Sequence, residues 1–239
     1  ALTAASYETV LGDSLYLDAY LSSLRLAVFA TLLTLLIGYP LAYAIARAPE
    51  HSRPALLMLA IAPFWTSFLI RVYAWITILK DEGLLNRALM SLGLISEPLH
   101  IFASDTAVVI GIVYSYLPFM ILPLYSNLEK HDLTLLEAAA DLGARPMTAF
   151  LRITLPLSIP GIVAGCLLVF IPAVGEYVIP SLLGRSDQLM IGRVLSDEFF
   201  ANRDWPVASA VAIVLLVALL VPILVFQRYQ NREIEAARR

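Results

Sequence analysis

The sequence alternates between long hydrophobic runs and shorter polar segments. Five of the runs are long enough to cross a bilayer as a helix, which takes about 20 residues. They cover residues 24–46, 55–79, 106–128, 157–183 and 207–227. Because backbone polar groups cannot remain unpaired in lipid, each run predicts a helix. No polar segment is long enough for a second domain, so the pattern predicts one all-α, polytopic membrane helix bundle over residues 1–239.

Several of these runs contain proline, which has no backbone N–H to donate and disturbs the helix around it. Pro63 lies in the second run, and Pro160 and Pro172 lie in the fourth. We therefore expect kinked helices whose free backbone groups are satisfied by their neighbours. The closeness of Pro172 and Gly175 favours a broken helix near the end of the fourth run.

Composition supports a membrane protein and excludes several kinds of chemistry. The chain is 60% hydrophobic and 15% charged, and its mean hydropathy is +0.81, whereas soluble domains are about 45–50% apolar and about 25% charged. The one cysteine, Cys166, lies inside a hydrophobic run, so no disulfide framework or cysteine metal site is expected. The formal net charge of −3 argues against nucleic acid as a partner.

The sequence also lacks the usual motifs of an enzyme. Its three histidines show no metal-ligand spacing, and no GxxxxGK[ST] motif is present. No nucleophile elbow occurs either. We therefore expect neither catalysis nor a bound cofactor in this chain.

A count of Lys and Arg predicts which side of the membrane each polar segment faces. Segments 47–54, 129–156 and 228–239 carry nine of them, whereas segments 1–21, 80–105 and 184–206 carry five. The positive-inside rule places the first group in the cytoplasm, including residues 129–156 (the coupling segment) and the C-terminus. Since five spans leave the N-terminus outside, we expect one further helix before Ala1.

The outer segments are also acidic. They hold eleven Asp or Glu against five bases, while the inner segments hold seven acids against nine bases. A negative outer mouth attracts cations. The alternative is that a protein that docks outside uses these acids.

The coupling segment contains a spaced motif. It reads Glu137-Ala138-Ala139, then Gly143, then Ile153-x-Leu155-Pro156. This spacing resembles the EAA loop of bacterial ABC-importer permeases. The resemblance implies that the segment docks on a separate ATPase subunit, which binds ATP and Mg²⁺. The implied coupling residues are Glu137, Ala138, Ala139, Asp141, Gly143 and Ala144.

The alternative for this segment is an ordinary amphipathic connector. Thr134 and Glu137 are spaced as in a capping box, which would begin a helix at Thr134. In either case Gly143 is expected to end that helix, and Pro156 is expected to mark the entry to the fourth span.

Further segments resemble the permease subunits of spermidine/putrescine importers. They are residues 63–73, 117–120, 123–126, 172–177 and 202–206, and the fourth of them is most similar to the putrescine-type subunit. The likeness implies a type I ABC importer permease fold in the bacterial inner membrane. It also implies a second, homologous permease subunit, an ATPase dimer and a periplasmic polyamine-binding protein. Members of the family usually have six spans.

Glu176 is the one acid well inside a hydrophobic run. Intramembrane acids usually face a transport pathway or a partner. We therefore predict a place for Glu176 in the substrate pathway. The alternatives are a salt bridge with Arg71, or a position near the outer end of a broken helix. Arg71 itself is interpreted as structural.

Aromatic side chains near the kinks are candidates for cation–π contact with ammonium groups. The predicted pathway residues are Trp65, Tyr73, Tyr114 and Tyr177. Tyr116 lies on a different helix face from Tyr114, so at most one of the two is expected to face the pore. Aromatic residues near span ends also form interfacial belts. Asp197 and Glu198 are candidates to receive a diamine, and the alternative is a docking rim for the binding protein.

These observations favour a permease subunit of an ATP-driven polyamine importer, with putrescine as the expected cargo. The alternatives are an ABC permease for spermidine, an amino acid or a metal complex, or a secondary transporter. A secondary transporter would need no docking loop and would more often carry several intramembrane charges.

Overall fold

The computed structural model describes residues 5–237, and no β-strand occurs in that range. The helices run in chain order as α1 (Ala5–Gly12), α2 (Ser14–Arg47), α3 (Arg53–Ile61), α4 (Phe68–Leu79), α5 (Leu84–Ser91), α6 (Asp105–Leu128), α7 (Thr134–Asp141), α8 (Pro146–Ala149), α9 (Leu155–Val174), α10 (Val178–Leu183), α11 (Ile191–Ser196) and α12 (Trp205–Ala237). Short irregular helices η1 (Ala62–Trp65), η2 (Phe150–Thr154) and η3 (Asp197–Ala201) join some of them. The all-α helix bundle predicted from the sequence is confirmed.

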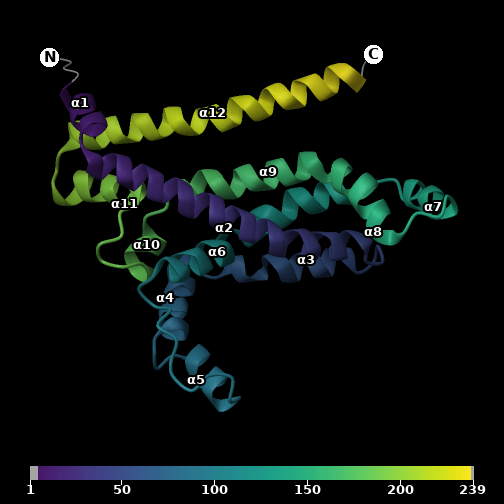
Figure 1. Ribbon diagram of the computed structural model, residues 1–239, viewed down its shortest axis with the longest axis horizontal. Coiled ribbons are helices and arrows are strands. Elements are labelled where there is room, and N and C mark those ends of the chain that lie inside the picture. Colours follow the sequence, from purple (N-terminus) through teal and green to yellow (C-terminus); the bar gives the residue numbers. More distant parts are fainter. Residues whose placement is uncertain (1–4, 238–239) are drawn as a thin grey trace.

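Three helical stretches of the described chain are long and apolar enough to cross a membrane. They are Ser14–Arg47, Asp105–Leu128 and Pro146–Val174. The fifth predicted run lies in α12, whose apolar part is described over Trp205–Val221. Helices α2, α6 and α9 pack together as the centre of the bundle (Figure 1).

The second predicted run does not form one straight helix. Its two parts, Arg53–Trp65 and Phe68–Ser91, meet at an angle of 85°. Pro63 lies in the 3₁₀ turn η1, and Thr66 after it is extended. Proline favours such an end because it cannot continue the hydrogen-bond ladder. As a result α4 and α5 turn away from the bundle (Figure 1).

The fourth predicted run begins and ends elsewhere than expected. The helix begins at Pro146, not at residue 157, and ends at Val174, not at residue 183. Pro146 occupies the first helical turn, where its missing N–H costs nothing. Pro156 does lie in the first turn of α9, as expected, although the helical stretch as a whole begins ten residues earlier. The turn before it widens into the π-helix η2, a common way to absorb a break in the ladder.

The core is divided between the two ends of the bundle. One cluster joins α2, α6, α10 and α11, and the other joins α2, α6 and α9 around Met120 and Leu124. In lipid such contacts stabilise by van der Waals packing, since acyl chains are as apolar as the side chains. At Gly38 the packing is so close that an added Cβ would lie 2.8 Å from Met120 Cγ.

Apart from α5, which projects from the side of the bundle, the polar segments gather at two opposite ends (Figure 1). The C-terminal ends of α2 and α12 lie near α7 and α8, whereas α1, α11 and η3 lie at the other end (Figure 1). Segments rich in Lys and Arg thus share one end of the bundle. Two of the basic residues used to predict orientation, Arg238 and Arg239, lie outside the described residues.

Candidate functional site

Helix α7 forms the tip of the coupling segment, and Gly143 follows its last residue, Asp141, by two positions. Gly143 has φ +77°, a left-handed conformation that glycine adopts without cost. Its N–H donates to the carbonyl of Ala140 at 2.8 Å, and the N–H of Ala144 donates to that of Ala139 at 2.9 Å. This pair of bonds is a Schellman motif, which satisfies the last carbonyls of a helix. These local backbone bonds therefore give the turn after α7 a defined shape.

Helix α7 does not begin with the expected capping box. Thr134 lies inside the helix, and its N–H donates to Asp132 Oδ1 at 2.9 Å. The local turn built by the Asp132 side chain competes successfully with a cap from Thr134. This bond from the Thr134 N–H holds the pKa of Asp132 below its usual value.

The two faces of α7 differ. No residue of α7 is buried, and Glu137, Ala138 and Asp141 are exposed. Leu142, which follows the helix, is 88% exposed, so a large apolar side chain stands free at the tip. The other face borders a pocket of about 240 Å³ lined by Leu136, Ala140, Ala144, Pro146, Ala149, Tyr43, Phe150 and Thr154. The exposed face has the form of a surface that another protein could grip.

Glu176 lies in the break between α9 and α10, at the opposite end. Its side chain is 9% exposed and accepts a hydrogen bond from the Tyr116 hydroxyl. It also accepts from the N–H of Val178 at 3.0 Å and from that of Ile179 at 3.4 Å. The carboxylate therefore caps the first turn of α10, where a negative charge is favoured by the free N–H groups.

Arg71 does not pair with Glu176. Its guanidinium carbon lies 4.3 Å from the centre of the Phe64 ring and 5.9 Å from that of Phe68. Its Nε and Nη1 atoms are buried and make no hydrogen bond within the described residues. Stacking on two rings lets a weakly hydrated guanidinium lie at this depth. The salt bridge considered as an alternative for Glu176 is therefore wrong.

The tyrosine that contacts Glu176 is Tyr116 and not Tyr114. Tyr114 packs edge-on against Trp75, with ring centres 5.4 Å apart. The two tyrosines do lie on different faces of α6, as their spacing predicted. Sequence reasoning named Tyr114 because nothing local distinguishes the two, and the contact joins residues 60 positions apart.

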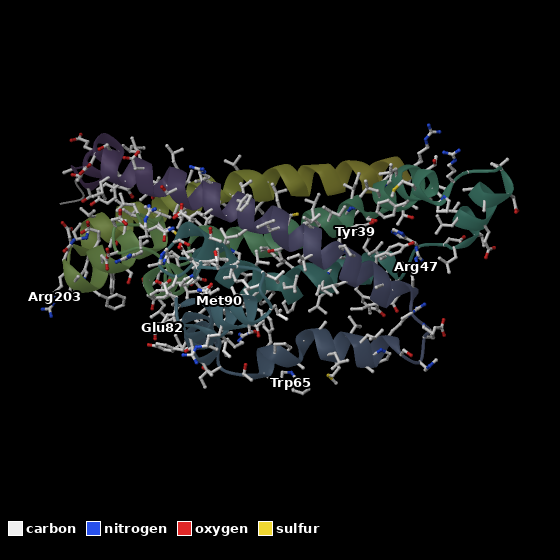
Figure 2. All side chains as sticks on the ribbon, turned by 60° about the horizontal axis from the view of Figure 1, so that its bottom comes forward. Tyr39, Arg47, Trp65, Glu82, Met90 and Arg203 are labelled. Atoms are coloured by element: carbon white, nitrogen blue, oxygen red, sulfur yellow. The ribbon has the colours of Figure 1, made fainter. Side chains whose placement is uncertain are left out.

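Within the described residues, none of the other predicted pathway residues makes a side-chain hydrogen bond to Glu176. Trp65 is 73% exposed, and Figure 2 shows it at the edge of the molecule. Tyr73 and Tyr177 are exposed as well, although Tyr177 lies next to Glu176 in the chain. Exposed aromatic side chains in a membrane helix bundle face lipid or another subunit.

Asp197 and Glu198 do not act as a free pair of acids. They are the first two residues of η3, and of the two only Asp197 is exposed. Glu198 accepts hydrogen bonds from the Tyr16 hydroxyl at 2.9 Å and from Asn202 Nδ2 at 2.9 Å. Glu198 therefore ties η3 to the start of α2. In the part of the chain that the structure describes, no group of three or more acids, histidines or cysteines could hold a metal ion.

Comparison with known proteins gives a family and a set of relatives. Residues 26–235 match the family of binding-protein-dependent transport system inner membrane components. The spermidine/putrescine transport system permease protein PotB of Escherichia coli K12 is 46% identical over 230 residues, which cover 95% of this chain and 84% of that protein. PotB of Salmonella typhimurium LT2 is 48% identical over 216 residues, which cover 90% and 75%.

Two solved structures share the fold. A bacterial ABC transporter that imports the acidic polysaccharide alginate superposes with a TM-score of 0.76 at 18% identity, over 97% of this chain and 84% of that one. The MetNI methionine ABC transporter in an inward-facing conformation gives 0.64 at 16% identity, over 90% and 94%. At these identities the likeness concerns the fold alone.

Proposed function

As a member of the family of binding-protein-dependent transport system inner membrane components, the chain is a permease of an ABC importer, and we propose that its cargo is a polyamine, with putrescine preferred. The observation that carries the proposal is the 46% identity to a spermidine/putrescine permease over 95% of the chain. Family membership sets aside a secondary transporter. The relatives are transport permeases and not enzymes.

The charges of the chain are compatible with a cationic cargo. The outer segments hold eleven acids against five bases, so their field attracts polyamines. Glu176 offers a carboxylate at the edge of a helix break, and the Tyr116 ring lies beside it. An ammonium group has two kinds of partner there, the carboxylate and the ring face.

Transport requires partners at both ends of the bundle. The exposed face of α7 would dock on an ATPase subunit in the cytoplasm, which binds ATP and Mg²⁺. A periplasmic binding protein would deliver the polyamine to the outer end, where Asp197 is exposed. A second, homologous permease subunit would complete the pathway as a heterodimer. ATP binding and hydrolysis then shift the pair between outward-open and inward-open states.

Within this scheme Glu176 has a defined task. Its hydrogen bonds to Tyr116 and to the first N–H groups of α10 hold the carboxylate in one place. A preformed acceptor binds a cation without first losing side-chain freedom. Because the same bonds fix the start of α10, a cargo that draws on Glu176 also acts on the position of α10.

Spermidine is the second candidate, since the names of the relatives include both polyamines. Putrescine is preferred because residues 172–177 resemble the putrescine-type subunit. Both candidates predict a pathway that favours cations over anions.

Uptake by the reconstituted importer tests the proposal. The chain would be assembled in liposomes with its second permease subunit, its ATPase and its binding protein, and labelled putrescine, spermidine and arginine would be compared. We expect ATP-dependent uptake of polyamines, with putrescine taken up best. An ATPase variant that cannot hydrolyse ATP is the control. Uptake of arginine but not polyamines would contradict the proposal, and a strong preference for spermidine would contradict its finer part.

A further inference from the structure

Phe150 connects the coupling segment with helix α2. Its ring centre lies 5.9 Å from that of Tyr39 and 6.1 Å from that of Tyr43, and both pairs are nearly perpendicular. Edge-to-face packing of this kind is the preferred geometry for aromatic pairs. Tyr39 and Tyr43 are four residues apart and lie on one face of α2. Together, Tyr39, Tyr43 and Phe150 form what we call the aromatic clamp.

The clamp stands on the widened turn that joins α8 to α9. Phe150 begins the π-helix η2, and its carbonyl accepts the bond from the Leu155 N–H. At the far end of this turn, the Ser158 hydroxyl donates to the Thr154 carbonyl, so the Tyr39 hydroxyl is the donor in its 2.8 Å bond to Ser158 Oγ. Helix α2 thus contacts the first residue of this turn and the first residues of α9 that follow it, and π-turns often occur at functional sites.

Helix α2 lacks one backbone hydrogen bond beside the aromatic clamp. Pro40 lies between the two tyrosines and cannot donate a bond within the helix. Two residues before it, Gly38 packs α2 closely against Met120 of α6. The segment after Pro40 continues to Arg47, whose guanidinium carbon lies 5.3 Å from the centre of the Tyr43 ring. Figure 2 shows Tyr39 and Arg47 on this end of α2.

The contacts around Pro40 define a short segment of α2, residues 41–47, that can pivot at Pro40 and is held by Phe150; we call it the lever. Residues 41–47 (the inner end of α2) follow a close contact at Gly38 and a missing hydrogen bond at Pro40. Phe150 holds the face of this segment that carries Tyr43. Kinks at proline are where helices bend, and packed side chains carry displacement from one element to the next.

We infer that Phe150 is a positioning residue that passes movement of the coupling segment to the inner end of α2. This inference rests on the proposed function, because the movement would come from an ATPase that holds α7. Residues of α7 and Tyr43 line a pocket of about 240 Å³ between them. Phe150 lines the same pocket and contacts Tyr39 and Tyr43 directly. Movement of the segment then reaches α2 as well as α9.

The first test measures polyamine uptake per ATP hydrolysed by the complete importer. Phe150→Leu keeps an apolar side chain but removes the ring edge that both tyrosines contact. We expect normal assembly and stimulated ATP hydrolysis, but a loss of about tenfold in uptake per ATP, within the usual range for coupling between two sites. Phe150→Tyr keeps the ring and should preserve the ratio. Phe29→Leu is the matched control, since Phe29 is an exposed residue of α2 that takes no part in the aromatic clamp.

The second test follows the lever directly. Spin labels at Glu50 and Lys130, in a Cys166→Ala background with verified uptake, report the inner end of α2 against that of α6. ATP should change this distance in the wild type and not in Phe150→Leu, while a Lys130–Arg145 pair still reports movement of the α7–α8 part of the coupling segment against the end of α6. A structural role alone would not separate these two distances.

The outcomes separate the inference from the proposed function. If the wild-type importer takes up no polyamine, the proposed cargo is wrong, and the distance measurement still tests the clamp because it needs only ATP. If Phe150→Leu keeps both uptake per ATP and the change in the Glu50–Lys130 distance, the clamp does not carry movement. Phe150→Leu could also fail to assemble while Phe29→Leu assembles normally. Phe150 would then serve the stability of the protein and not the transmission of movement, and the inference would be overturned.

Discussion

The chain interrupts its helices near both ends of the bundle, and it closes the two interruptions in different ways. After α7, Gly143 turns the backbone, and the free carbonyls are satisfied by backbone N–H groups. After α9, Gly175 is followed by Glu176, whose side chain caps α10 and binds the Tyr116 hydroxyl. The first break depends on a conformation, and the second depends on a charge.

This difference separates what each end can do. The break at Gly143 lies among exposed residues and presents a rigid shape outward. The break at Glu176 is buried, so its charge must be satisfied by the protein or by a cation. Shape suits docking of another protein, and a buried charge suits recognition of a small cationic molecule.

Glu176→Gln should have the largest effect, because it removes the charge on which the second break depends. Losing one partner of a buried, charged hydrogen-bond pair costs about 2–5 kcal/mol. We expect putrescine uptake by the reconstituted importer to fall sharply while expression and ATPase assembly persist. Since Arg71 stacks on Phe64, adding Arg71→Gln should restore nothing. A well-folded Glu176→Gln importer with unaltered uptake would leave Glu176 as a plain helix cap.

Tyr116→Phe asks whether the hydroxyl matters to the acid. It removes one hydrogen bond to a charged group, worth about 1.5–3 kcal/mol. We expect weaker uptake at low putrescine concentration, measured as a higher apparent KM. Tyr114→Phe is the matched control, because Tyr114 packs on Trp75 and has no bond to Glu176. Equal effects of the two changes would remove the special role of Tyr116.

Gly143→Val tests the break that depends on conformation. A β-branched residue strongly disfavours φ near +77°, and such strain costs about 1–3 kcal/mol. No atom lies within 4 Å of the position that a Cβ would take, so the effect comes from the backbone and not from a clash. We expect an assembled importer with low uptake and poorly stimulated ATP hydrolysis. Gly143→Asn, which tolerates this conformation better, should be milder, and equal activity of all three would remove the mechanical argument.

His131 provides the smallest effect, a dependence on pH at the coupling end. Burial lowers the pKa of His131 below its usual 6.5, and its Nε2 lies 3.2 Å from the Leu157 carbonyl. The folded state thus binds fewer protons than the unfolded state, so stability is complete above pH 6.5 and declines as pH falls below it. Melting temperatures between pH 7.5 and 5.5 should fall more for the wild type than for His131→Gln. The same slope in both proteins would show that other groups set it.

Much of the fold could be predicted because its causes are local. Long apolar runs require helices in lipid, and a glycine with a spaced motif around it marks the end of α7. The membrane-spanning helix bundle of ABC importer permeases follows from such patterns, and the solved structures with this fold agree with it.

The features that the sequence did not predict depend on contacts between distant segments, which no local pattern reveals. The second run breaks at an angle of 85° just after Pro63, and the turn before Pro156 widens into the π-helix η2. Tyr116 is joined to Glu176, and Phe150 to Tyr39, only after distant segments have packed. A proline predicts that a helix is disturbed, but the neighbours decide whether it bends, widens or stops.

The close contact between Gly38 and Met120 limits how this protein can be engineered for heat resistance. Replacing helix glycines by alanine is a standard stabilising change, worth about 1 kcal/mol where space allows. At Gly38 the new methyl group would meet Met120 Cγ at 2.8 Å and push α2 away from α6. A thermostable variant would therefore have to change both positions together, with a smaller residue at Met120, or leave this crossing untouched.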